Sequence, residues 1–169
     1  GAIRHDLRRG TVIIADTVRT EAGSVFATDP AWRRQLAAAL GEQDHVKVGS
    51  LLSLKAVAAS PEEKRRLAES SGAVAVDMES AAVAKVANLH GLPFIAIRAI
   101  VDEAHHCVPS AAAAAVDAEG RSRPWRIAGP LLKKPSQIGS LLQLARGASA
   151  ADRSLADICR LAGPGFGLV

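Results

Sequence analysis

The feature that most constrains the fold is a regular alternation of β-branched apolar runs with helical segments. Strands that alternate with helices in this way are typical of α/β sheets whose strands run largely parallel. No internal repeat or low-complexity linker interrupts the pattern, so residues 1–169 are predicted to form a single domain. The predicted strands are Thr11–Val18, His45–Leu54, Ala73–Val76 and Phe94–Val101, the last of them buried on both faces.

Helix boundaries follow from capping residues, prolines and glycines. Asp29 caps a helix with Pro30 at its first position, and Ser60–Glu63 reads as a capping box. Asp77 is expected to cap a third helix, which ends at a glycine. The predicted helices are Pro30–Leu40, Pro61–Ser70, the segment between Asp77 and Gly91, Pro135–Ala145 and Ala151–Leu161.

Composition excludes several classes of protein. Apolar residues make up 49% of the chain and charged residues 22%, which is typical of a folded protein and not of a disordered one. No apolar run reaches the roughly 18 residues of a membrane span, and no signal peptide is recognisable. Cys107 and Cys159 lack metal-ligand spacing and are interpreted as reduced thiols. We therefore expect a cytoplasmic protein.

The net charge of +4 is unevenly distributed. Six cations and no acid lie between Glu119 and Asp152, together with Trp125 and several leucines. An amphipathic segment of this kind can dock on the inner face of an anionic membrane. The alternative, and the commoner case, is that the leucines pack on the sheet and the cations coat the surface. Because aromatic residues are not interleaved with the cations, nucleic-acid binding is not expected.

Two acidic segments follow predicted strands. Asp77 and Glu79 come after the third strand, where α/β sheets bind ligands. Asp77 has a structural role as a cap, whereas Glu79 either complements the helix dipole or serves a site. Asp102 follows the fourth strand, where it either caps a turn or donates a proton. Arg98 lies within that strand, so we expect it to pair with an acid.

A metal site is not predicted. His105, His106 and Cys107 are adjacent in sequence, but neighbouring histidines rarely reach one ion and no partner pair is evident. We expect no cofactor.

The two acidic segments, with their mutual spacing, resemble the purine-nucleoside phosphorylase and nucleosidase superfamily. The matched words are Ala-Val-Asp-Met-Glu-Ser-Ala-Ala-Val-Ala at residues 75–84 and Pro-Phe-Ile-Ala-Ile-Arg-Ala-Ile-Val-Asp at residues 93–102. The resemblance implies a three-layer α/β/α sandwich with a mixed sheet, and homo-oligomerisation. It also implies cleavage of the ribosyl C–N bond of a purine nucleoside.

By that resemblance, each site residue has a specific role. Glu79 accepts hydrogen bonds from the ribose 2′- and 3′-hydroxyls, Met78 packs on the sugar, and Asp102 is the acid near purine N7. Asp77 belongs to the substrate-binding segment and Arg98 supports it. An ionised Glu79 would favour a ribosyl cation, while a protonated Asp102 would neutralise the leaving purine.

Short segments in the C-terminal third of the chain narrow the resemblance to the hopanoid-associated phosphorylase branch. They include Asp117–Arg121, Leu131–Pro135 and Leu141–Arg146. That branch is implicated in releasing adenine from adenosylhopane. The alternatives are a methylthioadenosine/S-adenosylhomocysteine-type nucleosidase, against which the long basic tail argues, and a degenerate member that binds nucleosides without turnover.

The family pattern also places a strand and a glycine-rich phosphate segment before the position of Gly1. The glycines Gly10, Gly23 and Gly49 are isolated and form no phosphate loop. We therefore expect a domain that lacks its N-terminal strands, an open sheet edge and little turnover from this chain alone. Whether water or phosphate attacks the sugar is left open.

Overall fold

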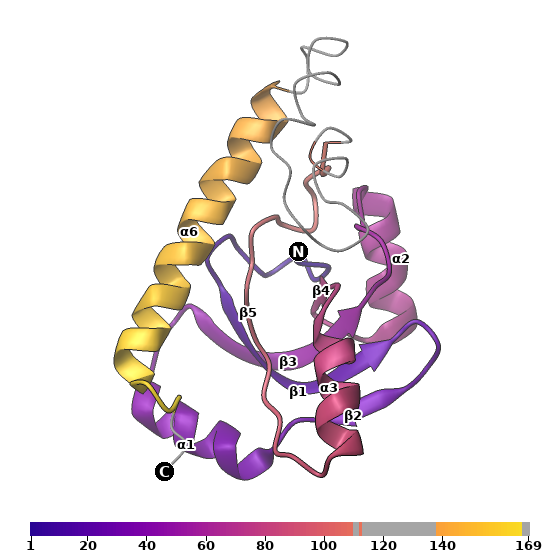
Figure 1. Cartoon of the computed structure of the whole chain (residues 1–169). Coiled ribbons are helices and arrows are strands. Elements are labelled where there is room, and N and C mark those ends of the chain that lie inside the picture. The colour runs from indigo at the N-terminus through magenta and orange to yellow at the C-terminus, as the bar shows by residue number, and fades with distance from the viewer. Residues whose placement is uncertain (110–111, 113–137, 167–169) are drawn as a thin grey trace.

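The computed structural model describes residues 1–109, 112 and 138–166 (Figure 1). Five strands and four helices have defined bounds in this part of the chain. The strands are β1 (Val12–Thr20), β2 (Val25–Ala27), β3 (Val46–Ser53), β4 (Ala75–Asp77) and β5 (Ile97–Ala99). The helices are α1 (Pro30–Leu40), α2 (Pro61–Ser71), α3 (Ser80–Leu89) and α6 (Ile138–Ala162).

All five strands belong to one mixed sheet. β3 pairs in parallel with both β1 and β4, whereas β2 and β5 run antiparallel to β1. Alternate residues of β1 face opposite sides: Val12 and Ile14 pack towards α1 and α6, while Ile13 belongs to the core on the other side. α3 lies against β1, β2 and β3. The predicted three-layer α/β fold is confirmed.

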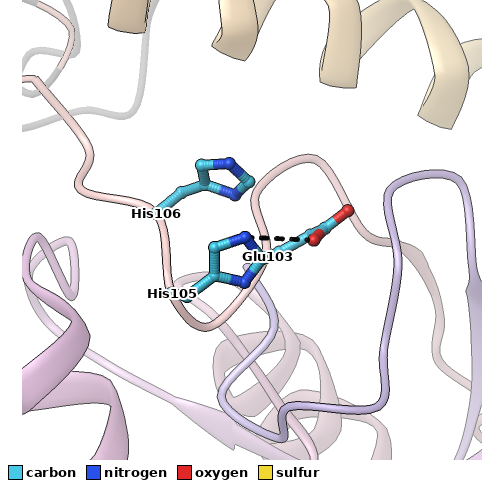
Figure 2. A group of neighbouring side chains, drawn as sticks. All are labelled: Glu103, His105 and His106. Atoms are coloured by element: carbon cyan, nitrogen blue, oxygen red, sulfur yellow. Dashed lines mark ion pairs between the residues drawn. The ribbon is translucent and has the colours of Figure 1, made fainter.

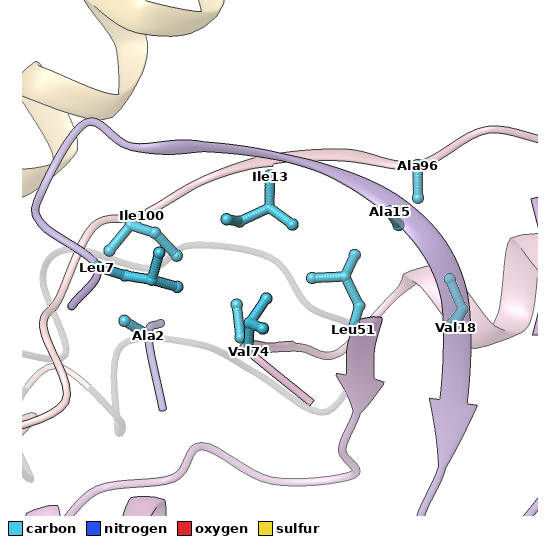
Figure 3. Packing of buried hydrophobic residues seen from close by; sticks show 10 residues of the cluster. Ala2, Leu7, Ile13, Ala15, Val18, Leu51, Val74, Ala96 and Ile100 are labelled. Carbon is cyan, nitrogen blue, oxygen red and sulfur yellow. The ribbon is translucent and has the colours of Figure 1, made fainter. Parts of the chain in front are cut away.

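The main core lies inside a curl of the sheet. Figure 3 shows Ile13 of β1 and Leu51 of β3 with Ala2, Val74 and Ile100 around one apolar centre. These side chains come from both edges of the sheet, because the segments around β4 and β5 are separated by the ladders of β3 and β1. The sheet is therefore strongly coiled, as right-handed strand twist allows.

The first two helices begin and end as predicted. The Asp29 carboxylate accepts a hydrogen bond from the Trp32 N–H at 2.7 Å, and α1 ends at Gly41. The Ser60 hydroxyl accepts from the Glu63 N–H at 3.1 Å, and the Glu63 carboxylate accepts from the Ala59 N–H at 2.9 Å. Local side-chain chemistry therefore determines where α1 and α2 start.

The start of α3 differs from the prediction. α3 begins at Ser80, so Glu79 occupies the N-cap position and Asp77 lies two residues before it. The Asp77 carboxylate still accepts from the Ser80 N–H at 3.2 Å and from the Ser80 hydroxyl. Glu79 makes no capping hydrogen bond with its side chain. Asp77 thus stabilises the helix start from outside the usual cap position.

The last strand and the last helices also differ. β5 has only three residues, is half-buried and runs antiparallel to β1, so it does not repeat the parallel geometry of β4. The two predicted C-terminal helices are a single helix, α6, which is continuous through Gly147. A side chain at position 147 would collide with the Val101 carbonyl, because a Cβ there would lie 1.9 Å from that oxygen. Close packing against the strand region explains this glycine within the helix.

β4 lies at one edge of the sheet, and the first residues pair with part of it. The Gly1 carbonyl accepts from the Val76 N–H at 2.8 Å, and Ala2 forms an isolated antiparallel bridge with Ala75. The Ala2 N–H also donates to the Asp102 carbonyl at 2.8 Å. The segment Gly1–Ala2 therefore bridges β4 and the segment after β5.

Two sequence predictions concern membranes. Within residues 1–109 and 138–166, no helix combines the length and the apolar character needed to cross a bilayer. Most of the basic segment for which membrane docking is predicted lies outside the described residues.

Candidate active site

One cavity is lined by all five residues to which the family resemblance assigns a role. Its volume is about 260 Å³, close to the lower end of small-molecule pockets at roughly 300 Å³. Its wall includes Asp77, Met78, Glu79, Arg98 and Asp102. Residues 25 positions apart in the sequence are thus brought to a single site.

The curl of the sheet brings the residues of β4 and β5 close together. In a flat sheet, β4 and β5 would be three strand spacings apart, about 14 Å. Instead, Nε of Arg98 on β5 lies 2.7 Å from Oδ2 of Asp77 on β4. The predicted pairing of Arg98 with an acid is confirmed, although its side chain is 37% exposed and not fully buried.

Glu79 lies on the solvent-exposed side of the site, called the open side below. Its side chain is 66% exposed, and its carboxylate Oε2 lies 3.8 Å from Nη2 of Arg98. The Met78 N–H donates weakly to the same carboxylate at 3.4 Å, and Met78 is itself partly exposed. Arg98 therefore lies between the two acids, hydrogen-bonded to Asp77 and without a hydrogen bond to Glu79. The Glu79 carboxylate remains accessible to a ligand.

Asp102 lies on the enclosed side of the site, called the closed side below. Its side chain is 14% exposed, and its Oδ2 accepts a hydrogen bond at 2.5 Å from Nζ of Lys64, which is fully buried. The Lys64 ammonium also donates to the carbonyls of Glu103 at 3.0 Å and His106 at 2.9 Å. All three ammonium protons thus have acceptors, which is required of a charge at this depth.

Lys64 was missed by the sequence prediction. The signal was present: Lys64 lies three and four residues before Leu67 and Ala68, the residues of α2 that pack on the core. A lysine on the apolar face of an amphipathic helix needs a buried partner. The capping box, which starts α2 at Pro61, places Lys64 in the first turn facing the loop after Asp102.

The remaining wall is mainly apolar and approaches the backbone closely. Leu54, Val57 and Val108 contribute side chains, while Gly1 contributes backbone. A Cβ at Gly1 would lie 2.6 Å from Oδ2 of Asp102. An apolar wall with a few convergent polar groups is typical of sites for small organic ligands.

A second polar cluster lies on the loop after Asp102. Figure 2 shows Glu103, His105 and His106 close together, with Nε2 of His105 3.6 Å from the Glu103 carboxylate. Two guanidinium groups already bind this cluster: Arg8 contacts Glu103 at 3.3 Å, and Arg9 lies 2.9 Å from Nε2 of His106. These cations disfavour a further cation, so the geometry favours an ion-pair network that holds the loop.

The electrostatics of this cluster agree with that interpretation. Burial lowers the pKa of His106, and repulsion by Arg9 lowers it further. Burial acts to raise the pKa of Glu103, but hydrogen bonds from the Arg9 N–H and the Arg8 side chain outweigh it, so this pKa lies below its usual value. The cluster thus carries an ionised Glu103 at neutral pH.

Solved structures show how the fold is used elsewhere. A TM-score of 0.56 and 27% identity relate the chain to a Weissella paramesenteroides protein provisionally assigned as a methylthioadenosine nucleosidase, with 62% of this chain and 54% of that chain covered. Futalosine hydrolase of Helicobacter pylori gives a TM-score of 0.60 at 20% identity over 95% and 64% of the two chains. 5′-Methylthioadenosine/S-adenosylhomocysteine nucleosidase of S. pneumoniae gives a TM-score of 0.61 at 18% identity, with 96% of this chain and 66% of that chain covered.

The chain therefore spans about half to two thirds of the length of these proteins. No protein with a curated description matches the sequence. A family description does match, and it covers residues 1–125 of the 169. The matched residues include the whole cavity wall described above. The chain belongs to the Phosphorylase superfamily.

Proposed function

We propose that the cavity binds a purine nucleoside and that the protein cleaves its ribosyl C–N bond. The observation that carries the proposal is the placement of two carboxylates with different surroundings on one small cavity. Glu79 is exposed and accessible, whereas Asp102 is enclosed. Cleavage of this bond needs two such groups, because positive charge develops on the sugar while negative charge develops on the purine.

The proposed roles follow from these surroundings. The Glu79 carboxylate accepts hydrogen bonds from the ribose hydroxyls and stabilises the cationic sugar. Met78, which lines the cavity next to it, packs on the sugar ring. Asp102 exchanges a proton with the purine, which is general acid catalysis worth roughly 10²–10⁴-fold in rate. Membership in the superfamily and the nucleosidases among the structural neighbours support this assignment.

Base release tests the proposal directly. The full-length natural protein is incubated with adenosine, with and without inorganic phosphate, and free adenine is measured by chromatography. We expect adenine in at least one condition, and the dependence on phosphate identifies the nucleophile. A well-folded protein that binds adenosine without releasing adenine would instead be a non-catalytic nucleoside-binding member of the family.

We propose adenosylhopane as the natural substrate. Support comes from the resemblance of the tail to the hopanoid-associated branch, although much of that tail lies outside the described residues. A lipid-linked substrate also agrees with the predicted docking of the basic segment on membranes. The test compares adenine release from adenosylhopane in anionic vesicles with release from adenosine. A preference for free adenosine would contradict this assignment.

A second candidate is a methylthioadenosine/S-adenosylhomocysteine-type nucleosidase. It is favoured by the 27% identity to the Weissella protein. Parallel assays with methylthioadenosine, S-adenosylhomocysteine and adenosylhopane distinguish the two candidates by their kcat/KM values.

We also propose that the protein forms homo-oligomers. The outer face of α3 presents Val83, Val86 and Leu89, which are 55%, 56% and 77% exposed. These side chains share one helix face, and contiguous exposed apolar surface marks interaction sites when it is large. Sedimentation velocity should show a dimer or larger species, and Val86→Glu should shift it towards monomer. A monomer at high concentration would contradict the proposal.

A further inference from the structure

The buried Lys64 has a place in the chemistry that the proposed function does not assign. It is fully buried and lies in the first turn of α2, outside the cavity wall and behind Asp102. Burying an ammonium group costs several kcal/mol, which its partners must offset. All three of its hydrogen-bond partners belong to the segment 102–106.

The hydrogen bonds of Lys64 distinguish the two oxygens of Asp102. An ammonium group has donors and no acceptor, so an oxygen that it binds at 2.5 Å must itself accept. A proton on Oδ2 would weaken that hydrogen bond, because a carboxylic hydroxyl oxygen is a poorer acceptor than a carboxylate or carbonyl oxygen, so Lys64 favours Oδ1 as the oxygen that carries a proton. Among the described residues no hydrogen-bond donor contacts Oδ1, whereas Oδ2 has the Lys64 ammonium.

We propose that Lys64 is a positioning residue that reserves Oδ2 as an acceptor and leaves Oδ1 of Asp102 as the oxygen that exchanges a proton with the purine. This inference rests on the proposed function. The ion-paired Asp102 carboxylate takes a proton from solvent on Oδ1 once the purine is bound; as the C–N bond breaks, its electron pair moves to the purine, and N7 takes that proton from Oδ1. The Asp102 carboxylate that remains is stabilised by the Lys64 ammonium, while water or phosphate captures the ribosyl cation.

The same lysine fixes the orientation of Asp102. The carbonyls of Glu103 and His106 hold the ammonium from two further directions, so the Asp102 carboxylate cannot rotate without losing a charged hydrogen bond. The capping box at Ser60 and Glu63 holds the helix end from which Lys64 extends. A fixed proton donor keeps the orientation that proton transfer requires.

The test separates positioning from a purely structural role through the leaving group. Adenosine needs a proton on its departing base, whereas 4-nitrophenyl riboside releases an anion that is stable without one. Lys64→Met in the full-length protein should lower kcat for adenosine about 10²-fold with little change in KM. Its effect on 4-nitrophenyl riboside should stay within about threefold. Lys64→Arg, which keeps the charge, should recover part of the loss.

Arg65→Met is the matched control, because Arg65 is the exposed neighbour whose ion-pair partner within the described part of the chain is Glu69 at the surface. It should leave both substrates unchanged. Equal losses for both substrates in Lys64→Met would overturn the positioning role and leave Lys64 as a tie between α2 and the loop. If Lys64→Met does not fold, Lys64→Arg provides the test. The ratio of kcat for adenosine to kcat for 4-nitrophenyl riboside is then compared with that of the wild type, and an unchanged ratio rejects the positioning role. A wild-type protein that cleaves neither substrate would instead reject the proposed function, and this role with it.

Discussion

The two sides of the cavity hold their carboxylates in opposite ways. Asp102 is 14% exposed and contacts a fully buried ammonium at 2.5 Å, whereas Glu79 is 66% exposed and lies 3.8 Å from a partly exposed guanidinium. The first acid has its position before any ligand arrives. The second has room to adjust. A carboxylate is thus part of the fold on one side of the site and a free ligand contact on the other.

The largest expected effect is on the closed side and concerns catalysis. Asp102→Asn keeps the shape of the side chain and an acceptor for Lys64, but it removes the group that exchanges a proton. We expect adenine release to fall by roughly 10²–10⁴-fold, while nucleoside binding stays measurable by calorimetry. Wild-type turnover in this variant would reduce Asp102 to a turn-capping residue.

The next effect concerns stability on the same side. Asp102→Ala leaves the buried Lys64 ammonium without its charged partner, and breaking a buried pair in this way costs about 3–5 kcal/mol. Urea unfolding measures the change in the free energy of unfolding. A loss below about 1 kcal/mol would mean that the pair is hydrated in solution, and it would remove the contrast between the two sides.

The open side should respond in substrate recognition and not in stability. Glu79→Gln removes a charged acceptor, and each hydrogen bond to such a group is worth about 1.5–3 kcal/mol. We expect kcat/KM for ribonucleosides to fall accordingly, with a smaller fall for 2′-deoxynucleosides, and the free energy of unfolding to change by less than about 0.5 kcal/mol. Equal losses for both sugars would contradict the role of Glu79.

The smallest expected effect is that of an exposed ion pair, which serves as a reference for the three variants above. Arg65 and Glu69 form an ion pair with a contact of 3.1 Å, but their side chains are 55% and 62% exposed. Glu69→Ala should change the free energy of unfolding by at most about 0.5 kcal/mol, because solvent screens such pairs. A cost similar to that of Asp102→Ala would show that burial does not explain the difference between the two sides.

Much of the fold was predictable from residues close in sequence. Asp29, Ser60 and Glu63 place the starts of α1 and α2 because a cap acts on N–H groups within three or four residues. The sequence also placed the strands approximately. It did not predict that β5 is short and antiparallel, nor that α6 is one helix, since both depend on packing against distant segments.

The sequence by itself determined the candidate residues. These are the acids that follow two of the predicted strands, together with Met78 and Arg98. Only the tertiary structure decided that these residues share one cavity, because the coil of the sheet brings β4 and β5 from opposite edges to within a side chain's reach. It also decided which acid is enclosed. Lys64 and Asp102 are 38 residues apart, and the burial of that pair depends on α2 packing over the loop after β5. No local pattern contains a contact of that kind, because its energy depends on solvent exclusion by the whole fold.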